Sequence, residues 1–202
     1  NWVLAPVCDI NNNPNNPVIN MRAWGEDPWT VSNLTVAFNR GLVSQGVLSC
    51  AKHFPGHGDT SVDSHLELPT LDHDLNRLEE VEFVPFKAVI ASGVDSVMSA
   101  HVLLPYIDPN YPATLSSQVI NLLREKIGFE GLLVTDALVM EAITKTFGGK
   151  EAAVMAFAAG ADLLMMPEDP DEVINSICAA LLSGRIPMKR LEQALHRRKT
   201  LL

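Results

Sequence analysis

Short apolar runs alternate along the chain with longer segments in which apolar residues recur at helical spacing. The runs are WVLAPV, GVLSCAK, DSVMSAHV, GLLVTDA and DLLMMP, and a loop and then a helical segment follow each of them. Apolar runs of this length are typical of strands that a parallel sheet buries on both faces. The pattern therefore predicts an alternating β–α chain.

The helical segments carry recognisable start and stop signals. Residues 26–46 have Pro28 in the predicted first turn and glycines towards the end, and residues 116–128 run from a serine to a glycine. The other predicted helices span residues 75–92, 149–160, 171–184 and 188–202. No linker rich in Gly, Ser or Pro separates these elements. We therefore expect residues 1–202 to belong to one domain.

Two architectures are compatible with consecutive parallel β–α units. An open doubly wound sheet usually carries a glycine-rich turn after its first strand, and PVCDINNNPNN is not such a turn. The alternative is a TIM (β/α)8 barrel, which takes about 250 residues. We expect this α/β fold, with the chain supplying the last five units and the first three strands outside the sequence. Residues 3–7 and 163–166 would then be edge strands that pair with the missing part of the barrel.

Polar residues follow the predicted strands at the ends where a barrel enzyme places its active site. In chain order these residues are Asp9, Lys52 and His53, His101, Asp136, and Met166 with the proline after it. A single polar residue at such a position more often satisfies nearby loop backbone, because buried polar groups need partners. Five equivalent positions together favour a functional site.

Asp136, in LLVTDAL, directly follows a predicted buried strand and precedes a helix. Its carboxylate would suit the N-cap of that helix, where Asp is a favoured residue. A carboxylate held at the mouth of a barrel is also what nucleophilic attack on the anomeric carbon of a sugar requires. Position alone leaves both interpretations open.

Residues 52–68, KHFPGHGDTSVDSHLEL, concentrate histidines and aspartates in one loop. The residues with side chains suited to a metal are His53, His57, Asp59, Asp63 and His65. Their spacing matches no strong signature such as HExxH, and the glycines beside His57 are typical of a flexible hairpin tip. The sequence therefore favours a site without metal.

The pair Asp63 and His65 fits acid–base chemistry better. Two residues apart in an extended segment, their side chains would lie on the same side, so that the carboxylate orients the imidazole. The imidazole would protonate a leaving group and later take a proton from water. The two glycines of the loop would let it close over substrate. The remaining histidines of this region, His57 and His73, are expected to be structural or solvent-facing.

Composition and charge narrow the partners. The chain of 202 residues is 47% hydrophobic and 19% charged, as in ordinary globular domains. Its formal net charge of -9 would repel nucleic acid and anionic membranes. No apolar run approaches the roughly 20 residues that cross a bilayer. We expect a small or neutral ligand and no cofactor.

The three cysteines, Cys8, Cys50 and Cys178, are odd in number and lie in apolar runs. This favours reduced, buried thiols over a disulfide framework, and thus a cytoplasmic protein. The chain opens at Asn1 within an apolar stretch, without an initiating Met or a signal peptide. We expect its natural N-terminus to lie outside this sequence.

The motif KHFPGHGDTSVDSH, with RAWGEDP before it and GLLVTDALVM after it, resembles the β-N-acetylhexosaminidases of glycoside hydrolase family three. These bacterial enzymes remove terminal N-acetylglucosamine during peptidoglycan recycling. The resemblance covers the whole chain and implies that its strands are strands four to eight of the family's barrel. A DQEGG-like segment, which holds the sugar from the third strand in that family, is absent from the sequence.

The resemblance also implies roles for individual residues. Asp136 would be the catalytic nucleophile, His65 the general acid/base and Asp63 its dyad partner. Arg22, Lys52 and His53 are similar to residues that bind the sugar hydroxyls. Position at the strand ends adds three further candidates for substrate binding, which are Asp9, His101 and Met166. Related β-glucosidases lack the FPGHG…DSH loop, so the loop favours an N-acetylated substrate.

The implied activity is retaining hydrolysis that releases terminal N-acetyl-β-D-glucosamine from glycoconjugates or peptidoglycan fragments through a covalent glycosyl-Asp intermediate. Phosphate would replace water if the chain belongs to a phosphorylase of the same family. A truncated sugar-binding fragment without catalysis is a further alternative, and a metal-dependent hydrolase would lose activity with a chelator.

Overall fold

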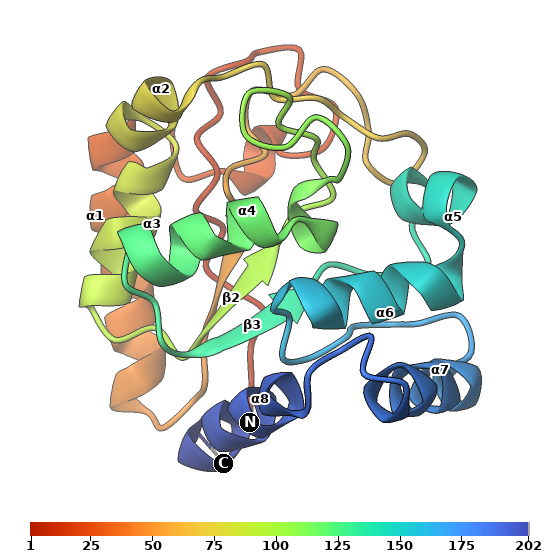
Figure 1. The fold of residues 1–202 in the computed structure, drawn as a ribbon. Coiled ribbons are helices and arrows are strands. Elements are labelled where there is room, and N and C mark those ends of the chain that lie inside the picture. The colour runs from red at the N-terminus through yellow and green to blue at the C-terminus, as the bar shows by residue number, and fades with distance from the viewer. Residues whose placement is uncertain (202) are drawn as a thin grey trace.

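A computed structural model describes residues 1–201, and it places helices around a central parallel sheet (Figure 1). The sheet contains β1 (Cys50–Phe54), β2 (Ser96–Ser99) and β3 (Leu132–Thr135) in that order, with both pairings parallel. All residues of β2 and β3 are buried. The alternating chain predicted from the apolar runs is thus confirmed for these three strands.

Two extended segments continue the sheet on its outer sides. Residues 3–7 run parallel to β1, with a bridge between Val7 and Lys52, and a parallel bridge joins Leu163 to Val134 of β3. The expected neighbours are therefore present, but the prediction of regular strands at residues 3–7 and 163–166 is wrong. Pro6 has no N–H group to donate to a ladder, and the backbone leaves the extended region at Met166, where φ is 46°.

Helices follow each part of the sheet. In chain order they are η1 (Asn20–Arg22), α1 (Pro28–Ser44), α2 (Leu75–Glu80), α3 (Phe83–Ala91), η2 (Ala113–Leu115), α4 (Ser117–Asn121), the π-helical turn η3 (Leu122–Lys126), α5 (Glu141–Phe147), α6 (Gly149–Ala159), α7 (Pro170–Leu182) and α8 (Met188–Leu201). The predicted helices at residues 26–46, 149–160 and 171–184 are confirmed with shifts at their ends. The predicted closing helix is confirmed to residue 201, and its last residue lies outside the described range.

Asp27 shows why α1 begins where the sequence predicts. Its carboxylate accepts hydrogen bonds from the backbone N–H groups of Trp29 and Thr30 at 3.1 and 2.9 Å, which satisfies donors that have no partner within the helix. Asp169 caps α7 in the same way through Glu172. Asp-Pro at a helix start is therefore a signal that the fold uses twice.

The single helix predicted at residues 75–92 is divided into α2 and α3. Leu78 and Phe83 are both fully buried. In an unbroken helix these two side chains would face different sides, because five residues turn a helix by about 500°. A turn at Val81 and Glu82 brings both to the core. The short helix α5 was not predicted, and it follows the loop that begins at Asp136.

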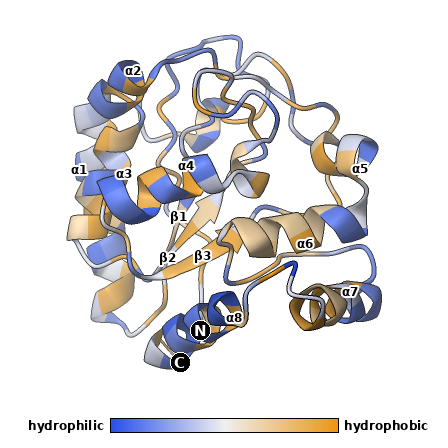
Figure 2. Cartoon of the chain, viewed as in Figure 1, coloured by the Kyte–Doolittle hydropathy of each residue, from blue (hydrophilic) through white to orange (hydrophobic). Residues whose placement is uncertain are grey.

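The core lies between the helices and the sheet, where hydrophobic residues gather in Figure 2. Phe54 at the end of β1 packs against Phe83 and Phe86 of α3, with ring centroids 5.5 and 5.3 Å apart. Burying such rings contributes strongly to stability and fixes α3 against the strand that carries Lys52 and His53. Among residues 1–201, no helix has the length and apolar character that a membrane crossing requires.

Asp162 anchors the other side of the sheet. Its buried carboxylate accepts from Arg124 Nη2 at 2.8 Å, from Arg190 Nη2 at 2.6 Å and from the backbone N–H of Leu133 at 3.0 Å. Arg197 of α8 adds a contact of 3.1 Å. Burial lowers the pKa of Arg124 to about 10, partly offset by the charge of Asp162. This ion cluster ties α8 and η3 to β3.

Candidate active site

The strand ends bring the predicted polar residues to one side of the sheet, where the loops cross the top of the view in Figure 1. Burial lowers the pKa of Lys52, and the charge of Arg22 lowers it further, whereas Cys50 and the carboxylates of Asp136 and Asp9 act in the opposite direction. Residues from three separate segments thus act on one ammonium group. Such convergence of charge is typical of functional sites.

The pairing of β1 with β2 is irregular at His53, and Asp9 takes over the free backbone group. Lys52 pairs with Met98 and Phe54 with Ser99, so His53 falls in a register shift. Its backbone N–H donates to both carboxylate oxygens of Asp9 at 3.2 and 3.3 Å. An irregularity of this kind redirects a side chain without leaving a buried N–H unpaired.

The ring of His53 is held between Asp9 and Arg22. Its Nδ1 lies 2.7 Å from Asp9 Oδ2, and its Nε2 lies 3.4 Å from Arg22 Nη2. A guanidinium can only donate, so Nε2 accepts and Nδ1 carries the proton that Asp9 accepts. Arg22 is exposed and is steadied by a bond from Nη1 to the carbonyl oxygen of Val18 at 3.2 Å. The predicted sugar-binding residues Arg22 and His53 are therefore in direct contact.

Asp9 itself is fully buried. Burial alone would raise the pKa of this carboxyl, but the positive potential and hydrogen bonds of His53, together with His57, hold the pKa below its usual value. Asp9 thus offers no free surface for the direct contact with sugar that the sequence predicted, and its carboxylate contacts His53 instead.

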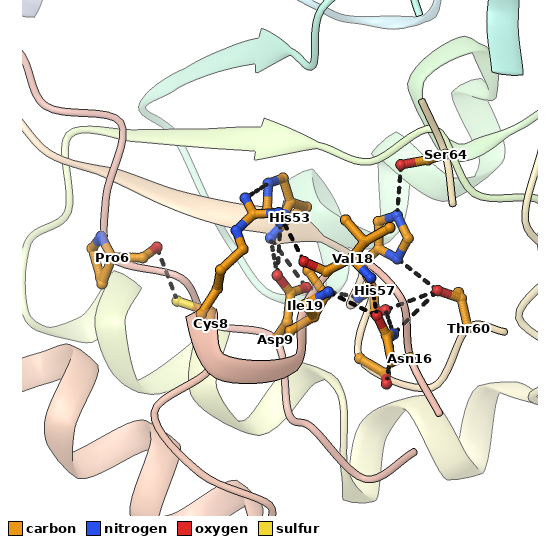
Figure 3. Close-up of polar contacts among 12 residues, drawn as sticks. Pro6, Cys8, Asp9, Asn16, Val18, Ile19, His53, His57, Thr60 and Ser64 are labelled. Carbon is orange, nitrogen blue, oxygen red and sulfur yellow. Dashed lines mark hydrogen bonds and ion pairs between the residues drawn. The ribbon is translucent and has the colours of Figure 1, made fainter. Parts of the chain in front are cut away.

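Asn16 joins the first loop to the loop that follows β1, as Figure 3 shows. Its amide nitrogen donates to the carbonyl oxygens of His57 and Gly58 at 2.8 and 2.9 Å. Its amide oxygen accepts from the backbone N–H groups of Val18 and Ile19 at 2.8 and 2.7 Å. One buried side chain therefore sets the position of the turn that leads to Arg22. The segment NNNPNN, which supplies Asn16, is not a glycine-rich turn, and its composition alone does not predict these contacts.

His57 is buried, with 1% of its surface exposed. Its Nδ1 lies 2.7 Å from Thr60 Oγ1, its Nε2 lies 2.9 Å from Ser64 Oγ, and its backbone N–H donates to Asp9 Oδ1 at 2.7 Å. Burial lowers the pKa of His57, and the negative charge of Asp9 partly offsets that effect. His57 was expected to be either structural or solvent-facing, and the structure shows that it is buried.

The loop around His57 is not the exposed tip that its glycines suggested. Gly56 and Gly58 are both buried. A Cβ on Gly58 would lie 1.7 Å from the carbonyl oxygen of Ile10, and a Cβ on Gly56, at φ 134°, would lie 3.0 Å from Glu82 Cγ. These glycines serve close packing between loops, so the prediction of a hairpin tip at this point is wrong.

Asp63 and His65 form the expected pair. Asp63 Oδ1 lies 2.7 Å from His65 Nδ1 and also accepts from the backbone N–H of His65 at 2.8 Å. The pair forms within a turn and not in an extended segment, because the backbone N–H groups of Leu66 and Glu67 both donate to the Asp63 carbonyl. Although partial burial would raise it, the pKa of Asp63 is held below its usual value by these bonds from His65.

The turn is attached to the segment that follows Asp136. The backbone N–H of Glu141, the first residue of α5, donates to the His65 carbonyl at 3.3 Å. Lys145 Nζ donates to the Leu66 carbonyl at 3.2 Å. The imidazole of His65 remains 61% exposed. The turn that holds Asp63 and His65 is thus anchored through its backbone, while the imidazole of His65 stays accessible.

Asp136 lies at the end of β3 and is half-buried. Its backbone N–H donates to the Ser99 carbonyl at 3.1 Å, and its Oδ1 accepts from the backbone N–H of Ala137 at 2.8 Å. Helix α5 begins only at Glu141, with Met140 as its N-cap residue. The alternative interpretation of Asp136 as a helix cap is therefore wrong.

His101 supports the same strand end from within the protein. It is fully buried, its Nε2 lies 3.0 Å from the Ala137 carbonyl, and its Nδ1 lies 2.9 Å from Thr114 Oγ1. A carbonyl oxygen only accepts, so Nε2 carries a proton. Burial lowers the pKa of His101, and Asp136 partly offsets this. His101 therefore has no surface for a sugar, and its contact with the site runs through Ala137.

Met166, the last predicted strand-end residue, is 60% exposed. Lys52 is half-buried beside the charges already described. The structure therefore brings Arg22, Lys52, His53 and Asp136 towards one place, and it keeps Asp9 and His101 behind them.

A second polar cluster below the loop was not predicted. His73 Nε2 lies 2.9 Å from Asp59 Oδ2, and Arg77 Nη2 donates to Glu82 Oε1 at 3.2 Å. Burial raises the pKa of Glu82, although Arg77 and His73 act against this. The cluster fixes the far side of the loop to α2, and residues 14 apart in sequence give no local signal of such a contact.

The described cysteines are unpaired, as expected, but their burial differs. Cys8 and Cys50 are buried, and burial raises the pKa of Cys50 to about 12. Cys178 is exposed, so the prediction of a buried thiol is wrong there, because its side of α7 faces solvent. Within residues 1–201, no group of three or more His, Cys, Asp or Glu side chains is arranged to hold a metal ion.

Comparisons with known proteins agree on one family of glycoside hydrolases. Residues 1–201 match the family model described as the glycosyl hydrolase family 3 N terminal domain. Beta-hexosaminidase A of Pseudoalteromonas piscicida is 43% identical over 203 residues, which cover 94% of this chain and 32% of that protein. The chain thus spans about a third of the length of this relative.

Solved structures extend the comparison. A glycoside hydrolase family 3 beta-N-acetylglucosaminidase from Paenibacillus sp. strain FPU-7 matches with a TM-score of 0.97 and 46% identity, over 100% of this chain and 39% of that one. The beta-glucoside phosphorylase BglX matches with a TM-score of 0.92 and 31% identity, over 98% of this chain and 37% of that one.

Proposed function

Because this chain belongs to glycosyl hydrolase family 3, we propose that it carries the catalytic residues of a retaining glycosidase. The N-terminal domain of that family is a TIM-barrel-like α/β fold, and the parallel sheet described above is part of one. We further propose that β1, β2 and β3 are strands five to seven of the barrel, and that residues 3–7 and 163–166, which join this sheet through isolated bridges, hold the positions of strands four and eight. Strands one to three would then belong to a part of the protein outside this sequence.

The observation that carries the proposal is the pairing of Asp63 with His65. A single carboxylate oxygen binds both the ring and the backbone of His65, so the ring is oriented while its Nε2 stays available. An oriented imidazole whose second nitrogen is accessible is suited to donate a proton and then to accept one. Asp136, at the end of β3, supplies a carboxylate to attack the sugar.

The reaction would proceed in two displacements. Asp136 attacks the anomeric carbon while protonated His65 gives its proton to the departing glycosidic oxygen, and a covalent glycosyl ester forms. His65 then takes a proton from water, the water oxygen attacks the anomeric carbon, and the Asp136 carboxylate leaves. The configuration at the anomeric carbon is retained, and the enzyme returns to its starting protonation state.

The proposed substrate is a terminal N-acetyl-β-D-glucosaminide of a glycoconjugate or a peptidoglycan fragment. Support comes from two relatives, a beta-hexosaminidase and a beta-N-acetylglucosaminidase. Arg22, Lys52 and His53 would bind the sugar hydroxyls. Peptidoglycan recycling is the process, and the cytoplasm the compartment, that we propose on the resemblance and on the unpaired cysteines.

Asp136→Ala and His65→Ala variants of the protein at its full natural length test this proposal. Turnover of a chromogenic N-acetylglucosaminide should fall by about 10³-fold or more for Asp136→Ala, because a missing nucleophile has no substitute. A 5-fluoro N-acetylglucosaminide should add its mass to Asp136 in the parent protein. Normal turnover in both variants would refute the proposal. A chelator should leave activity unchanged, and its loss would favour the metal-dependent alternative.

A phosphorylase is the second candidate, because BglX is described as a beta-glucoside phosphorylase. Phosphate would replace water in the second displacement and yield a sugar 1-phosphate. Product analysis with and without phosphate separates the two reactions. If N-acetylglucosamine binds in calorimetry but no substrate turns over in either buffer, the third alternative, a sugar-binding module, is favoured.

A further inference from the structure

A continuous series of hydrogen bonds joins the proposed sugar-binding residues to the acid–base turn (Figure 3). Arg22 contacts His53, and His53 Nδ1 lies 2.7 Å from the Asp9 carboxylate. The other oxygen of Asp9 accepts from the backbone N–H of His57 at 2.7 Å. His57 Nε2 in turn lies 2.9 Å from Ser64 Oγ. His57 therefore lies between the proposed sugar-binding residues and the turn.

Ser64 is the residue between Asp63 and His65. It is 2% exposed, whereas the side chain of His65 is 61% exposed. The middle of the turn is thus held inside the protein while its catalytic ring projects outwards. A change in the position of Ser64 moves both members of the pair together.

The tautomer of His57 follows from its partners. Thr60 Oγ1 donates its proton to the His57 carbonyl at 3.1 Å and lies 2.7 Å from His57 Nδ1. A hydroxyl has one proton, so Thr60 accepts from Nδ1–H, and Nε2 is left to accept from the Ser64 hydroxyl. The imidazole is therefore neutral: its Nδ1–H donates to Thr60, and its Nε2 accepts from Ser64.

We propose that His57 is a positioning residue for the general acid/base, and that it acts through Ser64 to hold the Asp63–His65 turn. This inference rests on the proposed function, because His57 can position a general acid/base only if His65 transfers protons. His57 is buried and touches neither substrate nor the reacting atoms. Its effect is confined to the step in which His65 must be aligned with the departing oxygen.

Leaving-group dependence separates positioning from general structural support. A phenolate with strongly electron-withdrawing groups departs without protonation, whereas an alkoxide departs only as the alcohol. Misalignment of the acid therefore lowers kcat/KM for an alkyl glycoside and hardly lowers it for a dinitrophenyl glycoside. A loss of folded protein or of sugar binding lowers both values equally.

Ser64→Ala is the main test, in the protein at its full natural length. The change removes one hydroxyl and keeps Asp63, His65 and the glycine packing. We expect kcat/KM to fall by about tenfold for a methyl N-acetylglucosaminide and by less than about threefold for the dinitrophenyl analogue, the loss expected from one buried hydrogen bond. Ser61→Ala is the matched control, because Ser61 is exposed in the same loop and accepts only from Asn13. It should leave both values as in the parent.

A cycle with His57→Phe tests whether the two residues act as one unit. His57→Phe removes both ring contacts, and the double variant with Ser64→Ala should lose no more activity on the alkyl glycoside than His57→Phe alone. His57→Gln, which can still accept at Ser64, should recover part of the loss. Multiplied losses in the double variant would show independent roles and overturn the inference.

His65→Ala distinguishes the two levels of failure. If His65→Ala shows a large leaving-group dependence and Ser64→Ala shows none, the positioning role of His57 is refuted and the proposed function stands. If His65→Ala shows no leaving-group dependence, the proposed function fails and the inference falls with it. Equal losses on both substrates for Ser64→Ala, with an unfolding transition at lower denaturant, would assign Ser64 and His57 a purely structural role.

Discussion

Gly58 lies directly against the backbone of Ile10, so that a Cβ on Gly58 would sit 1.7 Å from the Ile10 carbonyl oxygen. The atoms that this Cβ would meet belong to the backbone of Ile10, so a change of side-chain rotamer cannot relieve the clash. The loop after β1 and the loop after residues 3–7 are therefore in contact at a point that only glycine permits.

We expect Gly58→Ala to lower the free energy of unfolding by about 2–4 kcal/mol, because backbone must move to make room. Sugar binding should weaken as well, since Asp9 lies next to Ile10 and holds His53. Gly41→Ala is the control, because nothing lies within 4 Å of a Cβ there and Gly41 is inside α1. That change should be neutral or stabilise by up to about 1 kcal/mol. Chemical denaturation measures both, and equal stability of the two variants would contradict the packing argument.

His101 allows a prediction about the nucleophile. His101→Phe removes the bond to the Ala137 carbonyl, and a displaced Asp136 should lower kcat by about 10- to 100-fold. KM should change little, because the ring of His101 is fully buried. Steady-state kinetics on an N-acetylglucosaminide gives both values, and the rate of labelling of Asp136 by a fluorinated sugar should fall in parallel. His196→Phe, on the exposed side of α8, is the control. A KM effect without a kcat effect would mean that His101 contacts substrate after all.

Asp162 is expected to matter for stability and not for chemistry. Asp162→Asn leaves Arg124 and Arg190 without their shared anion in a buried place, which should cost about 3–5 kcal/mol. Urea unfolding followed by fluorescence measures the change. Glu151→Gln is the comparison, because Glu151 and Arg185 form an exposed ion pair whose loss should be hard to detect. Similar unfolding curves for the two variants would show that burial of the cluster contributes little.

We expect the free energy of unfolding to fall in mild acid, because two histidines are buried. Burial lowers the pKa of both His57 and His101 in the folded protein. An unfolded histidine has a pKa of about 6.5, so below that pH the unfolded chain binds protons that the folded protein refuses. Their contribution is complete above about pH 6.5 and is lost as the pH falls towards the folded values.

The urea midpoint should therefore drop between pH 7.5 and pH 5.5. In His57→Gln the same pH change should produce a smaller drop, because one of the two titrating groups is gone. An equal drop in His57→Gln would assign the acid sensitivity to other groups.

The sequence predicted elements whose signals are local. Asp27 with Pro28 marks the start of α1, and Asp63 and His65 are close enough in sequence that any compact turn brings them into contact. The apolar runs located the three strands of the parallel sheet, whereas Pro6 interrupts the pairing of the first run.

Contacts between distant segments were not predictable in the same way. Asn16 bonds to the His57 carbonyl 41 residues away, and His57 bonds to Asp9 48 residues away. Spacing and composition do not predict these contacts, because they depend on how the two loops pack against each other. The glycines beside His57 suggest flexibility when the sequence is considered alone, because their close neighbours, Ile10 and Glu82, come from other parts of the chain.

The irregular pairing at His53 matters for anyone who wishes to transfer Lys52 and His53 to another protein. In a regular strand, neighbouring side chains point to opposite faces, so a barrel strand offers a designer every second residue. Here the adjacent residues Lys52 and His53 both lie near Arg22. A graft that copies only side chains onto an ideal strand would place one of them on the wrong face. A graft should therefore include the irregular strand together with Asp9. The Asp9 carboxylate accepts a hydrogen bond from the backbone N–H of His53, which the irregular pairing leaves free.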